Sequence, residues 1–217
     1  MKVLVIGATG GTGSHLLEQL IARGHEVRAM ARREEQLGDL RDRGAEAVLG
    51  DLEGDIDHAI EGVDAVAFCA GSGSSTGPDK TLLVDLYGAA RTIDACQQHG
   101  VRRYVMLSSI AAGDPLRGNE KIRHYLAAKH AADRILMCSD LDWTVVRPGG
   151  LTHDEATGAV ELGLPQLPER GMIPRADVAA VMARCLEDPR SHGAAFELIS
   201  GDIPVDDVVD RLADASR

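Results

Sequence analysis

A tyrosine and a lysine four residues apart, Tyr125 and Lys129, have the types and spacing needed for proton transfer. On a helix these positions share one face, so the phenol and the ammonium group point the same way. A phenol has a pKa of about 10 and is a poor acid or base at neutral pH. A nearby cation stabilises the phenolate and so brings proton transfer closer to the neutral range. A hydroxyl from Ser108 or Ser109, at the end of an expected strand, could then hold a substrate carbonyl or alcohol. Because such a pair is usually a surface feature of a helix, its interpretation depends on the rest of the chain.

The first thirteen residues supply a partner for that pair. Residues 3–6 (Val-Leu-Val-Ile) predict a strand buried on both faces, and an apolar helical pattern begins at Leu16. Gly7, Gly10 and Gly13 stand between them at three-residue steps. Without side chains, the turn lets a pyrophosphate approach the backbone, and the start of the helix offers free N–H groups and a partial positive charge. The stretch therefore predicts a nucleotide site.

The end of the second expected strand, residues 26–32, indicates which nucleotide is bound. An NAD site usually has an acidic residue there, which accepts a hydrogen bond from the ribose 2′-hydroxyl. This chain has Arg32 and Arg33, and the acids Glu34 and Glu35 follow only afterwards. Two guanidinium groups suit a 2′-phosphate, although a solvated arginine pair at a helix start is the alternative. We therefore expect NADP(H) to be preferred, with NAD(H) as the second cofactor.

The ends of the third and fourth expected strands, residues 45–51 and 65–71, complete the nucleotide site. Asp51 either accepts from the adenine amine or serves as a turn residue. The Gly- and Ser-rich residues 71–79 read as a loop over the cofactor or as a plain connection.

The elements that must position these residues alternate along the chain. Strands are expected at 3–6, 26–32, 45–51, 65–71, 103–109, 142–147 and 196–200, and helices near 12–23, 34–43, 80–99, 119–139, 175–187 and 204–214. This alternation predicts an α/β fold, a Rossmann-type doubly wound parallel sheet with helices on both faces. One domain over 1–217 is expected. The Gly-, Pro- and acid-rich chain at about 150–175 is expected to be an irregular lid over the substrate.

The composition of the chain limits the kinds of molecule that it is expected to bind. The 217 residues carry 23 Lys and Arg against 34 Asp and Glu, a formal net charge of −11, which disfavours nucleic acid and anionic membranes as partners. The cysteines are far apart and form no CxxC pair, which predicts reduced thiols in a cytoplasmic protein and no metal site. No signal peptide and no membrane-spanning run is expected.

With these features together, the chain resembles the short-chain dehydrogenase/reductase superfamily. The motifs occur in the order of that superfamily: GATGGTG at 7–13, GDL at 50–52, LSS at 107–109, YLAAK at 125–129 and RPGGL at 147–151. The chain is most similar to the atypical branch of NmrA-like and epimerase/dehydratase-like NAD(P)-binding proteins, over nearly its whole length. The motifs are specific for the fold and the cofactor and much less specific for the reaction.

The resemblance implies roles for individual residues. Tyr125 would be the general acid/base, and Lys129 would hold the nicotinamide ribose while favouring the phenolate. Cofactor contacts are implied at Gly7, Thr9, Gly10, Gly11, Thr12, Gly13, Arg32, Arg33, Asp51, Leu52, Ala70, Gly71, Ser108, Lys129, Pro148 and Gly149.

Two positions depart from the pattern of the family. Enzymes with the extended pattern place the active hydroxyl where this chain has Ile110, whereas the shorter pattern uses Ser109, which we assign as the third catalytic residue. Asp85 stands where many members have Asn, so its carboxylate either alters a proton relay or accepts a structural hydrogen bond.

The leading hypothesis is an NADP(H)-dependent oxidoreductase that moves hydride between the nicotinamide and a small carbonyl or alcohol. The alternatives are an epimerase or dehydratase that retains its cofactor, and a non-catalytic NADP(H) sensor or interaction protein. The expected oligomeric state is a monomer or a homodimer.

Overall fold

The alternating strands and helices assemble on one large sheet. The computed structural model describes residues 1–73 and 76–215, and within them nine strands form a sheet in the order β11-β8-β10-β6-β5-β4-β1-β2-β3. Seven neighbouring strands run parallel: β1 (Lys2–Ile6), β2 (Glu26–Ala31), β3 (Glu46–Leu49), β4 (Ala65–Phe68), β5 (Arg103–Leu107), β6 (Asp142–Pro148) and β10 (Ala194–Ser200). The antiparallel strands β8 (Ala159–Gly163) and β11 (Ile203–Pro204) extend one edge.

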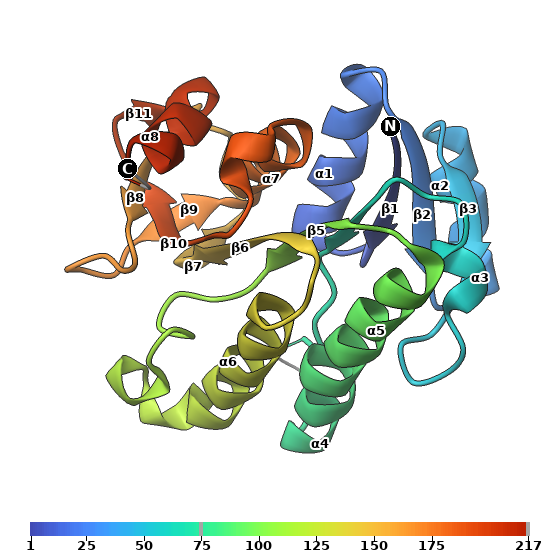
Figure 1. Cartoon of the computed structure of the whole chain (residues 1–217), viewed down its shortest axis with the longest axis horizontal. Helices are drawn as coiled ribbons and strands as arrows, with labels where there is room; N and C mark the ends of the chain where they lie inside the picture. Colours follow the sequence, from blue (N-terminus) through green and yellow to red (C-terminus); the bar gives the residue numbers. More distant parts are fainter. Residues whose placement is uncertain (74–75, 216–217) are drawn as a thin grey trace.

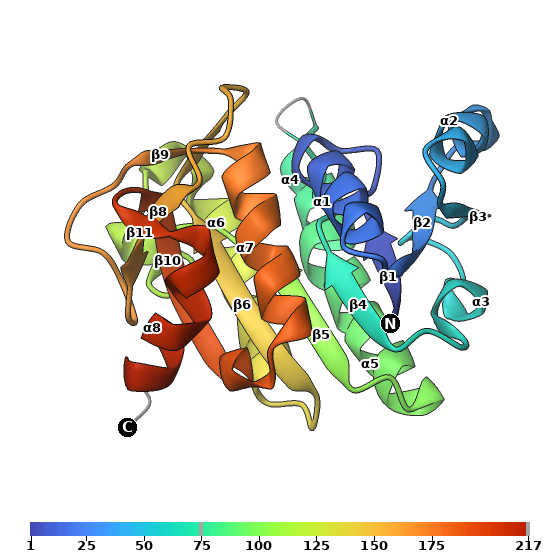
Figure 2. The same cartoon turned by 90° about the horizontal axis from the view of Figure 1, so that it is seen from above.

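Helices cover both faces of the sheet (Figures 1 and 2). One face carries α1 (Gly11–Ala22), α7 (Arg175–Glu187) and α8 (Val208–Ala215), and the opposite face carries α5 (Ala89–His99) and α6 (Arg123–Met137). Two short helices, α2 (Leu37–Asp42) and α3 (Asp57–Ile60), lie near β2 and β3. The predicted Rossmann-type α/β fold is confirmed.

Strand β1 shows why the sheet must be covered on both sides. Val3, Leu4, Val5 and Ile6 are fully buried. Successive side chains of a strand point to opposite faces. Val3 and Val5 accordingly pack in the core beneath α1 and α7, and Leu4 and Ile6 in the core beneath α5 and α6. The chain therefore needs two apolar cores, one on each side of the sheet.

The order of the strands places a crevice beside β1. This strand pairs with β2 on one side and with β4 on the other. The chain thus winds outward from β1 in one direction and then crosses to the other half of the sheet. In open α/β sheets, ligands bind outside the carboxyl ends of the strands at such a switch point. The glycine turn follows β1 at this point.

Two expected elements differ from the structure. The helix expected at 80–99 begins earlier and runs through α4 (Pro78–Lys80), a π-helical stretch at Thr81–Gly88, and α5. The region after β6 is not irregular: β7 (Gly150–Thr152) pairs in parallel with β9 (Met172–Pro174), and β8 joins the main sheet. Residues 74 and 75 of the loop expected at 71–79 lie outside the described residues.

Smaller differences concern the helix ends. Single 3₁₀ turns at Glu34–Gln36, Glu120–Ile122 and Val205–Asp207 precede α2, α6 and α8, and further turns lie at Pro115–Arg117 and Pro189–Ser191. Helix α7 has the bounds that the sequence predicts. Among the residues described, no helix is both long and apolar enough to cross a membrane.

Candidate functional site

Two adjoining cavities lie at the carboxyl ends of the parallel strands. The larger has a volume of about 570 Å³ and the smaller about 330 Å³. Both are lined by Cys69, Ala70 and Gly71, which directly follow β4. The glycine turn contributes to both cavities as well. The two cavities thus form an elongated site across the switch point, which suits a dinucleotide better than a single small ligand.

The glycine turn is so tightly packed that Gly7 and Gly13 have no room for a Cβ atom. Gly7 has a φ of +87°, and a Cβ there would lie 2.7 Å from the backbone nitrogen of Ala70. A Cβ on Gly13 would lie 2.2 Å from the carbonyl oxygen of Gly7. That same oxygen accepts a hydrogen bond from the Gly10 N–H at 2.9 Å. The turn therefore holds α1 close against β1 and leaves bare backbone beside the cavities, as a bound pyrophosphate requires.

The smaller cavity brings together residues from the ends of four strands, β1, β2, β3 and β4. It is lined by Gly7, Thr9, Gly10, Arg32, Arg33, Asp51 and Leu52, together with apolar groups such as Met30 and Val84. Arg32 is exposed, and Arg33 pairs with Glu35 at 3.2 Å. The Asp51 carboxylate accepts from the Glu53 N–H at 3.0 Å, so it serves as a turn residue while also lining the cavity.

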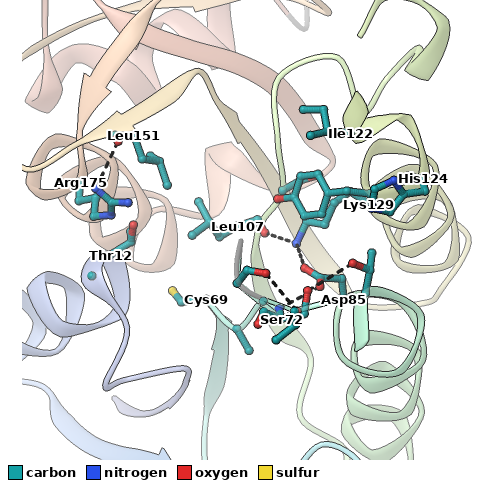
Figure 3. Close-up of a pocket in the computed structure, with 18 of the residues that line it drawn as sticks. Thr12, Cys69, Ser72, Asp85, Leu107, Ile122, His124, Lys129, Leu151 and Arg175 are labelled. Carbon is teal, nitrogen blue, oxygen red and sulfur yellow. Dashed lines mark hydrogen bonds and ion pairs between the residues drawn. The ribbon is translucent and has the colours of Figure 1, made fainter. Parts of the chain in front are cut away.

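The larger cavity contains the Tyr–Lys pair. Tyr125 and Lys129, both on α6, line it together with Gly11, Thr12 and Ser108. The Lys129 ammonium donates a hydrogen bond to the Leu107 carbonyl at 2.8 Å and lies 3.9 Å from Oδ1 of Asp85 (Figure 3). The side chains of Lys129 and Asp85 are 2% and 1% exposed, so this ion pair is buried. Tyr125, by contrast, is partly exposed toward the cavity.

Asp85 is one of the two positions at which the chain departs from the pattern of the family it resembles, and its two carboxylate oxygens have different surroundings. Its Oδ2 accepts from the Ser72 N–H at 3.0 Å, which fixes the loop after β4. Its Oδ1 faces Lys129 without a hydrogen bond to any part of the described chain. The π-helical stretch that carries Asp85 is itself a rare geometry, often found at functional sites. The carboxylate is therefore both a structural acceptor and a buried charge beside Lys129.

The two serines after β5 point to different surroundings. Ser108 is buried and lines the larger cavity. The Ser109 hydroxyl instead donates to the Ile110 carbonyl at 3.3 Å, and Ser109 is not among the residues that line either cavity. Ser108 is thus the serine at the cavity wall, but its Oγ is fully buried and forms no hydrogen bond with the described chain. Gly13, Pro148 and Gly149 also lie outside both linings.

A buried ion pair joins β6 to α6, the helix that carries Tyr125 and Lys129. The Arg147 Nε donates to Asp133 at 2.9 Å, which links β6 to α6. Burial raises the pKa of Asp133, while the charge of Arg147 acts in the opposite direction. Burial also raises the pKa of the Cys69 thiol to about 12, so this cavity-lining cysteine is a neutral group at physiological pH.

Some lining residues lie in segments that the sequence assigns to the site without giving the individual residues a role. Arg175 and Leu151 line the larger cavity, and so do Thr76 and Thr81. Arg175 stands where the sequence predicts the end of the lid and the start of a helix, with no role for its side chain. Its position depends on the packing of α7 against α1, two helices about 150 residues apart in the sequence, and local patterns give no sign of that contact. Within the described residues, no cluster of three His, Cys, Asp or Glu side chains is placed to hold a metal ion.

Comparisons with known proteins agree with this geometry. A family model described as NAD(P)H-binding matches residues 7–189. A protein of Bacillus subtilis (strain 168) named "Uncharacterized sugar epimerase YhfK" is 44% identical over 216 residues, covering 98% of this chain and 100% of that protein.

Solved structures give the same result. A structure from Bacillus halodurans, named for an NAD-dependent epimerase/dehydratase, is 46% identical with a TM-score of 0.94, and the match covers 97% of this chain and 99% of that one. The structure of the oxidoreductase ylbE from Lactococcus lactis is 28% identical with a TM-score of 0.87, covering 99% and 97%. The likeness therefore extends over whole chains.

Proposed function

The chain belongs to the NAD(P)H-binding family, and from this premise we propose that it is an NADP(H)-dependent oxidoreductase of the short-chain dehydrogenase/reductase type. The family and its structural relatives fit the NmrA-like, epimerase/dehydratase-like branch expected from the motifs. The observation that carries the proposal is the larger cavity, which brings Tyr125 and Lys129 of α6 to the same space as the glycine turn. The substrate in this proposal is a small carbonyl or alcohol.

The chain's own residues would bind the cofactor and move the proton. The bound nicotinamide cofactor supplies or accepts a hydride. Tyr125 gives a proton to the substrate oxygen during reduction, or takes it from an alcohol during oxidation. The buried Lys129 ammonium favours the phenolate that this exchange requires. Ser108 is our candidate for the hydroxyl that holds the substrate oxygen, because it lines the cavity whereas Ser109 does not; its Oγ, buried in this structure, must turn toward the ligand.

Preference for NADP(H) is supported by the smaller cavity. Arg32 and Arg33 both line it, and the carboxylate of Glu35, which pairs with Arg33, lies on an exposed side chain. A charge-assisted hydrogen bond contributes about 1.5–3 kcal/mol, so we expect NADPH to bind about tenfold to a hundredfold more tightly than NADH. Calorimetric titration of nucleotide-free protein with each cofactor measures this ratio. Equal affinities for the two cofactors would show that the arginines face solvent in the complex.

The role of Tyr125 is tested by Tyr125→Phe, which removes the hydroxyl and keeps the ring. We expect cofactor affinity to stay nearly unchanged, while turnover of NADPH with a panel of small aldehydes and ketones falls about a hundredfold or more. Tyr87→Phe is the matched control, because Tyr87 is 54% exposed and lines neither cavity. Undiminished turnover in Tyr125→Phe would exclude this residue as the general acid/base. Tight NADPH binding by the wild-type protein with no turnover across the panel would instead support a sensor.

The names of the relatives favour one mechanistic variant. Both the Bacillus subtilis and the Bacillus halodurans proteins carry names of the epimerase class. An enzyme of this class keeps its cofactor and returns it to the starting oxidation state in each cycle. It would purify with bound nucleotide and convert substrate without net NADPH consumption, whereas a reductase consumes one cofactor per turnover.

A further inference from the structure

Arg175 is a cation placed where its surroundings are already positive. Its side chain lies directly on Gly11, the first residue of α1: a Cβ added there would be 2.5 Å from Cδ and 2.7 Å from Nε of Arg175. Figure 3 shows Arg175 beside Thr12, on the opposite side of the cavity from Lys129 and Asp85. A helix N-terminus carries a partial positive charge and favours anions. A guanidinium beside it is therefore unfavourable unless an anion lies between them.

Nothing in the described chain supplies that anion. No carboxylate among residues 1–73 and 76–215 forms an ion pair with Arg175. Asp177, the nearest acid in sequence, uses its carboxylate to accept from Thr157 and from the Gly158 N–H. The first turn of α1 contains no acidic residue, and no side chain caps it. Arg175 is moreover the first residue of α7, so a second helix start lies at the same place.

The guanidinium is held in position by one of its nitrogens and leaves the others free. Nη1 donates to the carbonyl oxygens of Leu151 at 3.2 Å and Thr152 at 3.0 Å, both in β7. Nε and Nη2 form no hydrogen bond with the described part of the chain, and the side chain is half-buried at the cavity wall. A guanidinium with two neighbouring free N–H groups matches the geometry of a phosphate oxygen pair.

From these contacts we propose that Arg175, whose side chain lies on Gly11, binds the pyrophosphate of the nicotinamide cofactor from the α7 side of the site. The N–H groups at the start of α1 and the free N–H groups of Arg175 would both donate to the pyrophosphate oxygens. The same guanidinium fixes β7, whose Leu151 lines the larger cavity. One side chain thus joins the phosphate site to the substrate side. The inference rests on the family's nicotinamide cofactor, but neither on the role of Tyr125 nor on a preference for NADP(H).

The test measures binding of ligands that differ in the group recognised. Arg175→Gln is titrated with NADPH, with NADH and with adenosine 2′-monophosphate, which has no pyrophosphate. We expect the affinities for NADPH and NADH to fall by the same factor, about tenfold or more, and that for adenosine 2′-monophosphate to stay at its wild-type value. Arg175→Lys, which keeps the charge but not the paired N–H groups, should lose part of the affinity. Arg170→Gln removes one exposed positive charge outside both cavities and is the matched control.

The outcomes separate this inference from the proposed function. Unchanged affinity of Arg175→Gln for both dinucleotides would overturn it, and so would a loss confined to NADPH, which would assign Arg175 to the 2′-phosphate. Equal losses for all three ligands would also overturn it, because the variant would then have damaged the adenosine side. Turnover is not measured, so a failure of Tyr125 as a general acid/base leaves the result unaffected.

Discussion

At the scale of single residues, the proposed chemistry depends on Lys129, which interacts with neighbouring groups of the protein and also acts on Tyr125. Its ammonium donates to the Leu107 carbonyl and faces the Asp85 carboxylate at 3.9 Å. It also shares one helix face with Tyr125. An anion beside Lys129 offsets the positive charge that would otherwise act on the phenol. Asp85 therefore weakens the stabilisation of the Tyr125 phenolate by the Lys129 charge, which is the reason a lysine is needed at this spacing.

Asp85→Asn isolates that electrostatic effect. The amide keeps an oxygen that accepts from the Ser72 N–H, so the loop after β4 retains its anchor, and only the charge beside Lys129 is lost. In the proposed enzyme, we expect the acid limb of the pH–rate profile to move to lower pH, because the uncompensated ammonium favours the phenolate of Tyr125 more strongly. Leaving a buried charge unpaired also costs stability, about 3–5 kcal/mol in the free energy of unfolding. An exposed acid on α5, Asp94, provides the control Asp94→Asn. An acid limb that does not move would show that Asp85 is a structural acceptor only.

At the scale of elements, the sequence predicts well those parts that local patterns determine. The β1–glycine turn–α1 unit, the alternation of strands and helices along the chain and the bounds of α7 follow from apolar runs, glycine spacing and helical periodicity. Each of these signals lies within a window of about 15 residues. The shared face of Tyr125 and Lys129 was predictable for the same reason, because a single helix carries both residues, and both line the larger cavity.

Elements that depend on distant partners could not be predicted in the same way. Strand β8 exists because Leu162 pairs with Leu198, far along the chain, and β7 exists because it pairs with β9. Gly149 and Gly171 permit a close approach of the chain after β6, where a Cβ on Gly149 would lie 2.2 Å from the Gly171 carbonyl oxygen. The contact of Arg175 with Gly11 is another long-range event. A glycine pattern alone does not reveal which side chain lies on it.

At the scale of the whole molecule, many of the acidic side chains on the surface form ion pairs with Lys or Arg. A hydrogen bond from Lys2 lowers the pKa of Glu46, one from Arg102 lowers that of Asp142, and one from Arg190 lowers that of Asp188. A carboxyl whose pKa is lower in the folded state than in the unfolded chain stabilises the fold at every pH above its unfolded pKa. That stabilisation is lost as the pH falls through the folded pKa. The raised pKa of Asp133 acts in the opposite direction, because the folded state then binds its proton more readily than the unfolded chain.

We therefore expect a pH-dependent contribution from the pairs made by Arg190. This residue donates to Asp188 at 2.7 Å and to Asp210 of α8 at 2.6 Å. Because the pKa of Asp188 is held below its ordinary value of 3.8, its pair stabilises the fold at neutral pH and is lost as the pH falls below that value. Urea unfolding of Arg190→Gln at a series of pH values should show a deficit against the wild-type protein at neutral pH that shrinks toward acid pH. Arg170→Gln, which changes the net charge equally, should show no such convergence. A deficit of Arg190→Gln that is the same at every pH would mean that Arg190 acts through packing and not through the charge of Asp188.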